Sequence, residues 1–147
     1  MKPIARIRHE FVEYIPTDVK AGTLYISIQY STAVHKCCCG CGNEVVTPLS
    51  PTDWKLIFNG ETVSLAPSIG NWSFDCKSHY LIEDSNVRWA PRWSGQEIED
   101  GRARDREAKR RYFESRQKAY DASVAGTRGM NPDASKGSSP RSRVKKA

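Results

Sequence analysis

Four of the five cysteines lie within six residues, in the segment Cys37-Cys38-Cys39-Gly40-Cys41-Gly42. The fifth, Cys76, stands three residues before His79. Zn²⁺ prefers four nitrogen or sulfur ligands in a tetrahedron, and two short-spaced groups of ligands from separate turns supply them. The spacing therefore predicts that a bound Zn²⁺ joins residues 37–41 to residues 76–79.

The choice among the first three cysteines stays open at this stage. Cys38 and Cys41 have the spacing of a zinc knuckle, but Cys37 or Cys39 can take the place of Cys38. The candidate metal ligands are His9, Cys37, Cys39, Cys41, Cys76 and His79.

Disulfide bonds are the less favoured use of these cysteines. Neighbouring cysteines meet the required Cα separation and dihedral angle poorly, and five is an odd number. Charged residues recur after Met1, so that no apolar signal peptide is indicated and a cytoplasmic location is expected.

The positive charge is unevenly distributed. The chain has 147 residues with 23 Lys and Arg against 17 Asp and Glu, a net charge of +6, and residues 1–96 hold nine of each sign. The excess therefore lies in the C-terminal third, which predicts weak, salt-dependent contact with nucleic acid or a contribution to solubility. No window approaches the ~18 uninterrupted apolar residues that a membrane helix needs.

The patterning predicts an α+β protein: a small zinc-binding β-rich domain, one long C-terminal helix and a disordered basic tail. Residues 1–93 contain short β-branched and aromatic runs, and Asn59-Gly60 between two of them predicts a hairpin. Ser94 and Glu97 have capping-box spacing, so a charged helix is expected over 94–122, packed on the β-rich module or projecting from it. Low hydrophobicity predicts disorder over 123–147.

Two arrangements of the zinc site are compatible with the residues. In a catalytic site His9, Cys76 and His79 hold the metal, an open position binds water, and Glu13 takes the water's proton. The chain would then be a zinc metallohydrolase of peptidase or esterase type. In a closed site cysteines from 37–41 join Cys76 and His79 to fill four positions, and the metal only stabilises the fold.

Several segments resemble a bacterial family of formerly unknown function that is labelled for its Cys/Glu/His/His signature. The similarity extends over about residues 9–113, and its motifs are residues 9–13, 24–27, 35–42, 45–54, 63–72 and 76–80. Members often lie in gene clusters that encode ubiquitin-like proteins with activating and conjugating enzymes. Carried onto this chain, the signature falls on His9, Glu13, Cys76 and His79, with Glu44 and Cys39 as competing positions.

The resemblance implies a zinc-dependent hydrolase that removes a ubiquitin-like protein from its conjugates. Metal-activated water would attack an ester or amide linkage, and the partners would be the ubiquitin-like protein, its conjugates and the conjugation enzymes. The alternative is a non-catalytic, zinc-stabilised adaptor or nucleic-acid-associated module whose helix and tail recruit partners.

Overall fold

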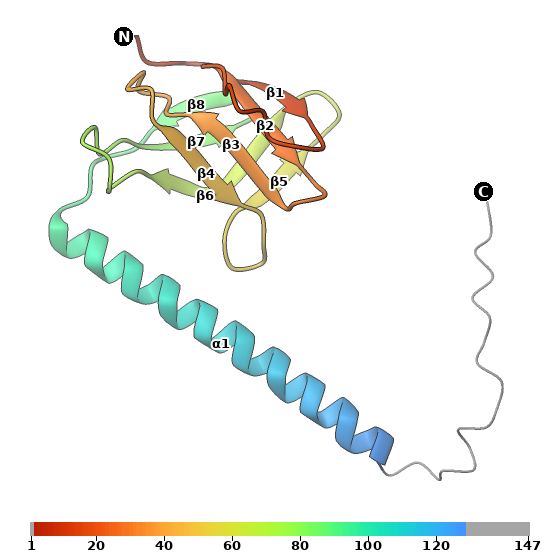
Figure 1. Ribbon diagram of the computed structural model, residues 1–147. Coiled ribbons are helices and arrows are strands. Elements are labelled where there is room, and N and C mark those ends of the chain that lie inside the picture. The colour runs from red at the N-terminus through yellow and green to blue at the C-terminus, as the bar shows by residue number, and fades with distance from the viewer. Residues whose placement is uncertain (1, 129–147) are drawn as a thin grey trace, which may run out of the picture. The chain divides into compact units, whose positions relative to one another are not determined.

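The computed structural model describes residues 2–128, which form two compact units, one through Arg106 and one from Glu107. Eight strands precede one long helix (Figure 1). The strands are β1 (Arg8–Phe11), β2 (Thr23–Ser27), β3 (Thr32–Lys36), β4 (Glu44–Pro48), β5 (Lys55–Phe58), β6 (Val63–Gly70), β7 (His79–Glu83) and β8 (Asn86–Trp89). The helix is α1 (Gly95–Arg128). A β-rich domain followed by one long helix is the architecture that the sequence predicted. None of the described helices is long and apolar enough to cross a membrane.

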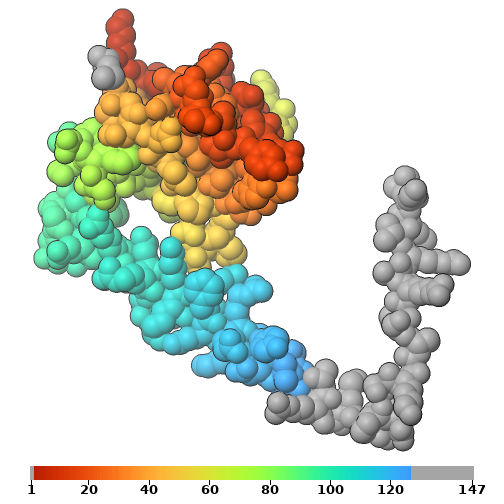
Figure 2. Space-filling model, viewed as in Figure 1, coloured from red at the N-terminus to blue at the C-terminus, as the bar shows by residue number. Residues whose placement is uncertain are grey.

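Each sheet has four strands in sequence order, β1-β2-β3-β4 and β5-β6-β7-β8. All neighbouring strands are antiparallel except β1 and β2, which are parallel. One buried cluster draws on both sheets, with Leu24 and Ile26 from β2 and Leu65 and Ile82 from β6 and β7. The sheets therefore pack face to face around a shared core, and Figure 2 shows the resulting close-packed body with the N-terminal segment, in red, against the orange strands.

The predicted hairpin forms between β5 and β6, with Phe58 paired to Val63. Its turn centres one residue later than the sequence suggested. Asn59 accepts hydrogen bonds on its side-chain oxygen from the backbone N–H groups of Glu61 and Thr62, and Gly60 takes a φ of 96°. Glycine tolerates this left-handed conformation because it has no Cβ.

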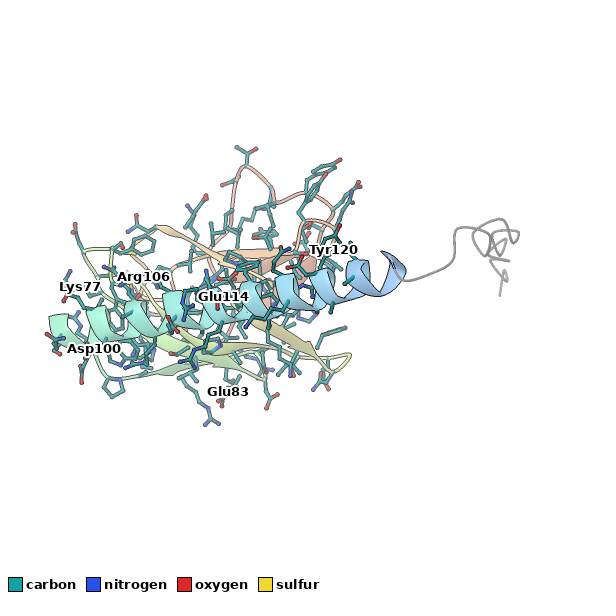
Figure 3. The ribbon with its side chains drawn as sticks, turned by 90° about the horizontal axis from the view of Figure 1, so that it is seen from below. Lys77, Glu83, Asp100, Arg106, Glu114 and Tyr120 are labelled. Atoms are coloured by element: carbon teal, nitrogen blue, oxygen red, sulfur yellow. The ribbon has the colours of Figure 1, made fainter. Side chains whose placement is uncertain are left out.

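The helix begins with the predicted capping box. The Ser94 N–H donates to the Glu97 carboxylate at 2.6 Å, and the Glu97 N–H donates to Ser94 Oγ at 3.2 Å. The helix continues to Arg128, so that residues 123–128 of the expected tail are helical, and the rest of that tail lies outside the described residues. Figure 3 shows Asp100, Arg106, Glu114 and Tyr120 distributed along the helix.

Candidate functional site

The thiol groups of Cys37, Cys39, Cys41 and Cys76 lie within 4.8 Å of one another. Cys37 Sγ is 3.4 Å from Cys39 Sγ and 3.9 Å from Cys76 Sγ. Zinc–sulfur bonds of ~2.3 Å in a tetrahedron place the sulfur atoms about 3.8 Å apart. Four thiols at such distances fit one tetrahedral metal ion.

Local backbone geometry brings the four sulfur atoms together. Cys37 directly follows β3, and the chain then turns through Gly40 and Gly42, whose φ values are 92° and 85°. Cys76 reaches the group from the loop between β6 and β7. The group therefore joins the first sheet to the second.

Polar groups surround the thiols and determine their protonation. Burial raises the pKa of Cys37. At Cys76 burial acts in the same direction, but hydrogen bonds with Ser78, Cys39 and Cys41 together outweigh it and lower the pKa to about 7. The Cys41 N–H donates to Cys39 Sγ at 3.3 Å. A thiol with a pKa near neutrality is readily available as the thiolate that binds metals.

Cys38 lies outside the group. It is fully buried in the core, its backbone N–H donates to the Tyr80 hydroxyl at 3.4 Å, and burial raises its pKa to about 12. The side chain of Cys38 therefore packs as an apolar core residue.

The three other predicted site residues also lie outside the group; among residues 2–128, no cluster of three or more metal-binding side chains includes them. His9 stands on β1 with its ring 5.7 Å from that of Phe11 and 5.3 Å from that of Phe58. Glu13 is exposed, and its backbone carbonyl accepts a hydrogen bond from Ser27. The roles of His9 and His79 as ligands and of Glu13 as base remain predictions.

His79 instead forms a pair with a residue that the sequence did not single out. His79 Nε2 lies 2.8 Å from Ser68 Oγ, and His79 Nδ1 lies 2.7 Å from the carbonyl oxygen of Pro91. Because a carbonyl can only accept a hydrogen bond, Nδ1 carries the proton of the neutral ring. Nε2 is then the acceptor, and the Ser68 hydroxyl donates to it. This is the relation between a nucleophile and its general base.

An irregularity in β6 places Ser68 beside His79. Leu65 pairs with Ile82 and Ile69 pairs with Tyr80, so β6 advances four residues while β7 advances two. The extra residues form a bulge that contains Ser68. Since side chains alternate along a strand, Ser68 emerges on the same face as Gly70, the residue paired with His79.

Two tryptophans enclose the imidazole, which is only 7% exposed. The ring centroids of Trp72 and Trp93 lie 5.0 and 5.2 Å from that of His79, and the two indoles stack at 5.5 Å. A Cβ on Gly70 would lie 2.5 Å from Trp72 Nε1. Glycine at this position therefore allows the indole to lie directly over the strand.

The thiol group and the Ser68–His79 pair are joined by short polar contacts. The residue before His79, Ser78, is buried, and its Oγ lies 3.0 Å from Cys37 Sγ and accepts from the Asn71 amide at 2.9 Å. The Arg92 guanidinium donates to the Cys76 carbonyl at 3.0 Å. Arg92 directly follows Pro91, whose carbonyl contacts His79. The cysteine loop therefore supports both segments that hold the histidine.

Sequence reasoning missed Ser68 because a serine between Pro67 and Ile69 carries no recognisable catalytic motif. Residues 63–72 were one of the motifs of the family resemblance, but residues 67–72 were expected to form a loop and no role was assigned to Ser68. The pairing depends on the bulge, and a bulge of this kind is not visible in residue spacing.

The family model described as bacterial ubiquitination-like system serine protease (BubE) matches residues 11–90. This segment is more than half of the chain and includes Ser68, His79 and all five cysteines. Comparison with curated proteins and with solved structures gave no match.

Proposed function

This chain belongs to the family of bacterial ubiquitination-like system serine proteases (BubE), and we propose that Ser68 is its nucleophile and His79 its general base. One observation carries the proposal: His79 Nε2 is 2.8 Å from Ser68 Oγ while Nδ1 is held by the Pro91 carbonyl. The family description supplies the reaction class, and this pair supplies the groups that the class needs.

The proposed reaction proceeds in two halves. Ser68 Oγ attacks the carbonyl carbon of the scissile bond while its proton passes to His79 Nε2, and the departing amine then takes that proton. Water next attacks the acyl-serine, again giving a proton to Nε2, and Ser68 leaves with its hydroxyl restored as the acid product is released.

The orienting group in this pair is the backbone carbonyl of Pro91. It fixes the tautomer in which Nε2 can accept, and its partial negative charge stabilises the imidazolium that forms when Nε2 takes the proton. Trp72 and Trp93 restrict the access of water to the ring. These contacts hold the histidine ready for proton transfer.

The four thiols are proposed as the ligands of a structural Zn²⁺. The donor set and the sulfur–sulfur distances fit this ion, which would contribute folding free energy by joining the two sheets. Residues Cys37, Cys39, Cys41 and Cys76 would hold it. In this account the metal takes no part in bond cleavage.

We propose a ubiquitin-like protein, linked through its C-terminus to a target or to a short extension, as the substrate. The support is the family description together with the resemblance to proteins encoded beside ubiquitin-like conjugation systems. The bond cleaved would be the amide at the C-terminal carbonyl of the ubiquitin-like protein.

The test compares Ser68→Ala with Ser73→Ala, a control in the nearby exposed loop, and with Glu13→Gln. The substrate is the ubiquitin-like protein of the same system with a C-terminal peptide extension, and cleavage is followed by mass. Ser68→Ala is expected to lower turnover by a factor on the order of 10³ or more, because the nucleophile is removed. Full activity of Ser68→Ala with loss in Glu13→Gln would instead support the metal-activated water predicted from the sequence.

A further inference from the structure

Among residues 2–128, no strand lies beside β6 on one side of its backbone next to Ser68. β5 begins at Lys55, which pairs with Ala66, so no residue of β5 stands opposite residues 67–70. Gly70 is exposed. This short length of β6 is therefore an open sheet edge within the same strand as the proposed nucleophile.

The chain before β5 turns away from this edge to pair elsewhere. The Trp54 N–H donates to the Pro48 carbonyl at 3.0 Å, and the Trp54 carbonyl accepts from the Ser50 N–H at 3.2 Å. Trp54 also forms an isolated parallel bridge with Leu49. These contacts engage residues 49–54 with the end of β4 and leave the edge of β6 uncovered by them.

The backbone polar groups of Gly70 point toward the open edge. Asn71 N–H donates to the Ser78 carbonyl at 2.8 Å, so Asn71 faces β7, and the alternation of an antiparallel ladder directs the N–H and C=O of Gly70 the other way. Ala66 also faces the β5 side. The Val63 carbonyl accepts from the Ser85 N–H on the other side of β6, and alternation along the strand then directs Ala66 toward its partner Lys55. Ser68 lies between these two positions in the sequence.

We propose that the substrate binds in extended form as an added strand along this edge of β6, with the N–H and C=O of Gly70 as its main-chain partners. The inference rests on the proposed function of Ser68 and His79. A sheet edge recognises an extended peptide through main-chain hydrogen bonds at a spacing of about 4.8 Å.

The position of the base favours this occupant over any other. His79 stands on β7, on one side of β6, and the open edge lies on the other side. A peptide bound on the open edge would have its scissile carbonyl carbon on the opposite side of Ser68 from His79 Nε2. Ser68 Oγ would then lie between the base and the substrate. That order is the one that proton removal and attack require.

The inference also names the substrate class. An added strand needs a segment of several residues whose main-chain groups are not already hydrogen-bonded, such as the flexible C-terminal tail of a ubiquitin-like protein. A folded loop with its main-chain groups already paired would not fit this edge.

The first test attaches to Ser68 a peptidyl phosphonate that carries the last four residues of the partner ubiquitin-like protein. Hydrogen exchange of the glycine amides is then compared before and after labelling, with Gly60 at the β5–β6 turn as the control amide. Exchange of the Gly70 amide is expected to slow at least tenfold while that of Gly60 is unchanged. Unchanged exchange at Gly70 in the adduct would overturn the added strand but leave the nucleophile established. Absence of any adduct at Ser68 would overturn both.

The second test uses phosphonates that are N-methylated at one residue each and measures their rate of reaction with Ser68. Methylation of the one N–H that donates to the Gly70 carbonyl is expected to slow the reaction about tenfold, with less than threefold effects at the residues on either side of it. Equal effects at successive residues would overturn the proposal, because only a strand gives a period of two.

Discussion

Replacing Ser78 by alanine should weaken metal binding, although Ser78 is not itself one of the proposed ligands. Ser78 Oγ is buried, lies 3.0 Å from Cys37 Sγ and 3.5 Å from Cys76 Sγ, and accepts from the Asn71 amide at 2.9 Å. A hydrogen bond to a charged group contributes about 1.5–3 kcal/mol, which corresponds to a factor of about 10–100 in affinity. Ser78→Ala is therefore expected to bind Zn²⁺ 10–100 times more weakly than the unmodified chain.

Competition with a chromophoric chelator under reducing conditions measures this affinity. Ser73→Ala removes a hydroxyl from the same loop, but from an exposed position, and its Zn²⁺ affinity should match that of the unmodified chain. An affinity of Ser78→Ala within twofold of that value would refute the reasoning, because it would show that the Ser78 hydroxyl gives the thiolates no net stabilisation.

Two further predictions concern the buried pair of His35 and Tyr80. Tyr80→Phe removes the hydroxyl that lies 2.7 Å from His35 Nε2, and because His35 Nδ1 has no partner among the described residues, the ring loses its only hydrogen bond there. Urea denaturation should show about 1–3 kcal/mol less stability, and a loss below about 0.5 kcal/mol would count against it. Burial also lowers the pKa of His35 to about 4 from its usual 6.5. Between these pH values the unfolded chain binds a proton that the folded chain does not, so stability should fall as pH decreases from 6.5 to 4, by about 3 kcal/mol in full. His35→Gln, which does not titrate, should show a correspondingly flatter pH profile in the same urea experiments, and identical profiles would be inconsistent with a buried neutral histidine.

The cysteine pattern predicted more of the site than any other feature. Spacing alone joined residues 37–41 to Cys76, and the structure brings Cys37, Cys39, Cys41 and Cys76 together. Spacing could not exclude Cys38, because that depends on which side chain faces the core after β3 ends. The contact of its N–H with Tyr80, 42 residues away, is a tertiary feature.

For the histidines, spacing alone left the contacts of the side chain open. His79 was placed in the metal site because it follows Cys76 by three residues, but in the structure its two nitrogen atoms contact Ser68 and Pro91. Each of these partners is brought to His79 by strand pairing or by the chain after β8. A histidine near cysteines has several roles open to it, and the role of His79 as a metal ligand stays a prediction.

Local signals predicted the secondary structure well where the chemistry is local. The capping box of Ser94 and Glu97 forms as expected, and the hairpin at Asn59-Gly60 forms with its turn one residue later, because each depends on hydrogen bonds between residues two or three apart. The bulge at Ser68 depends instead on how β6 registers with β7. The proposed nucleophile is thus a residue that only the tertiary structure brings to notice.

Labelling with a fluorophosphonate, followed by peptide mapping, tests the central claim most directly. The reagent reacts with a serine that is activated by a base. The account predicts one adduct, on Ser68, and its loss in His79→Ala. A preparation that cleaves the ubiquitin-like substrate yet carries no label on Ser68, or that is labelled equally well without His79, would contradict it.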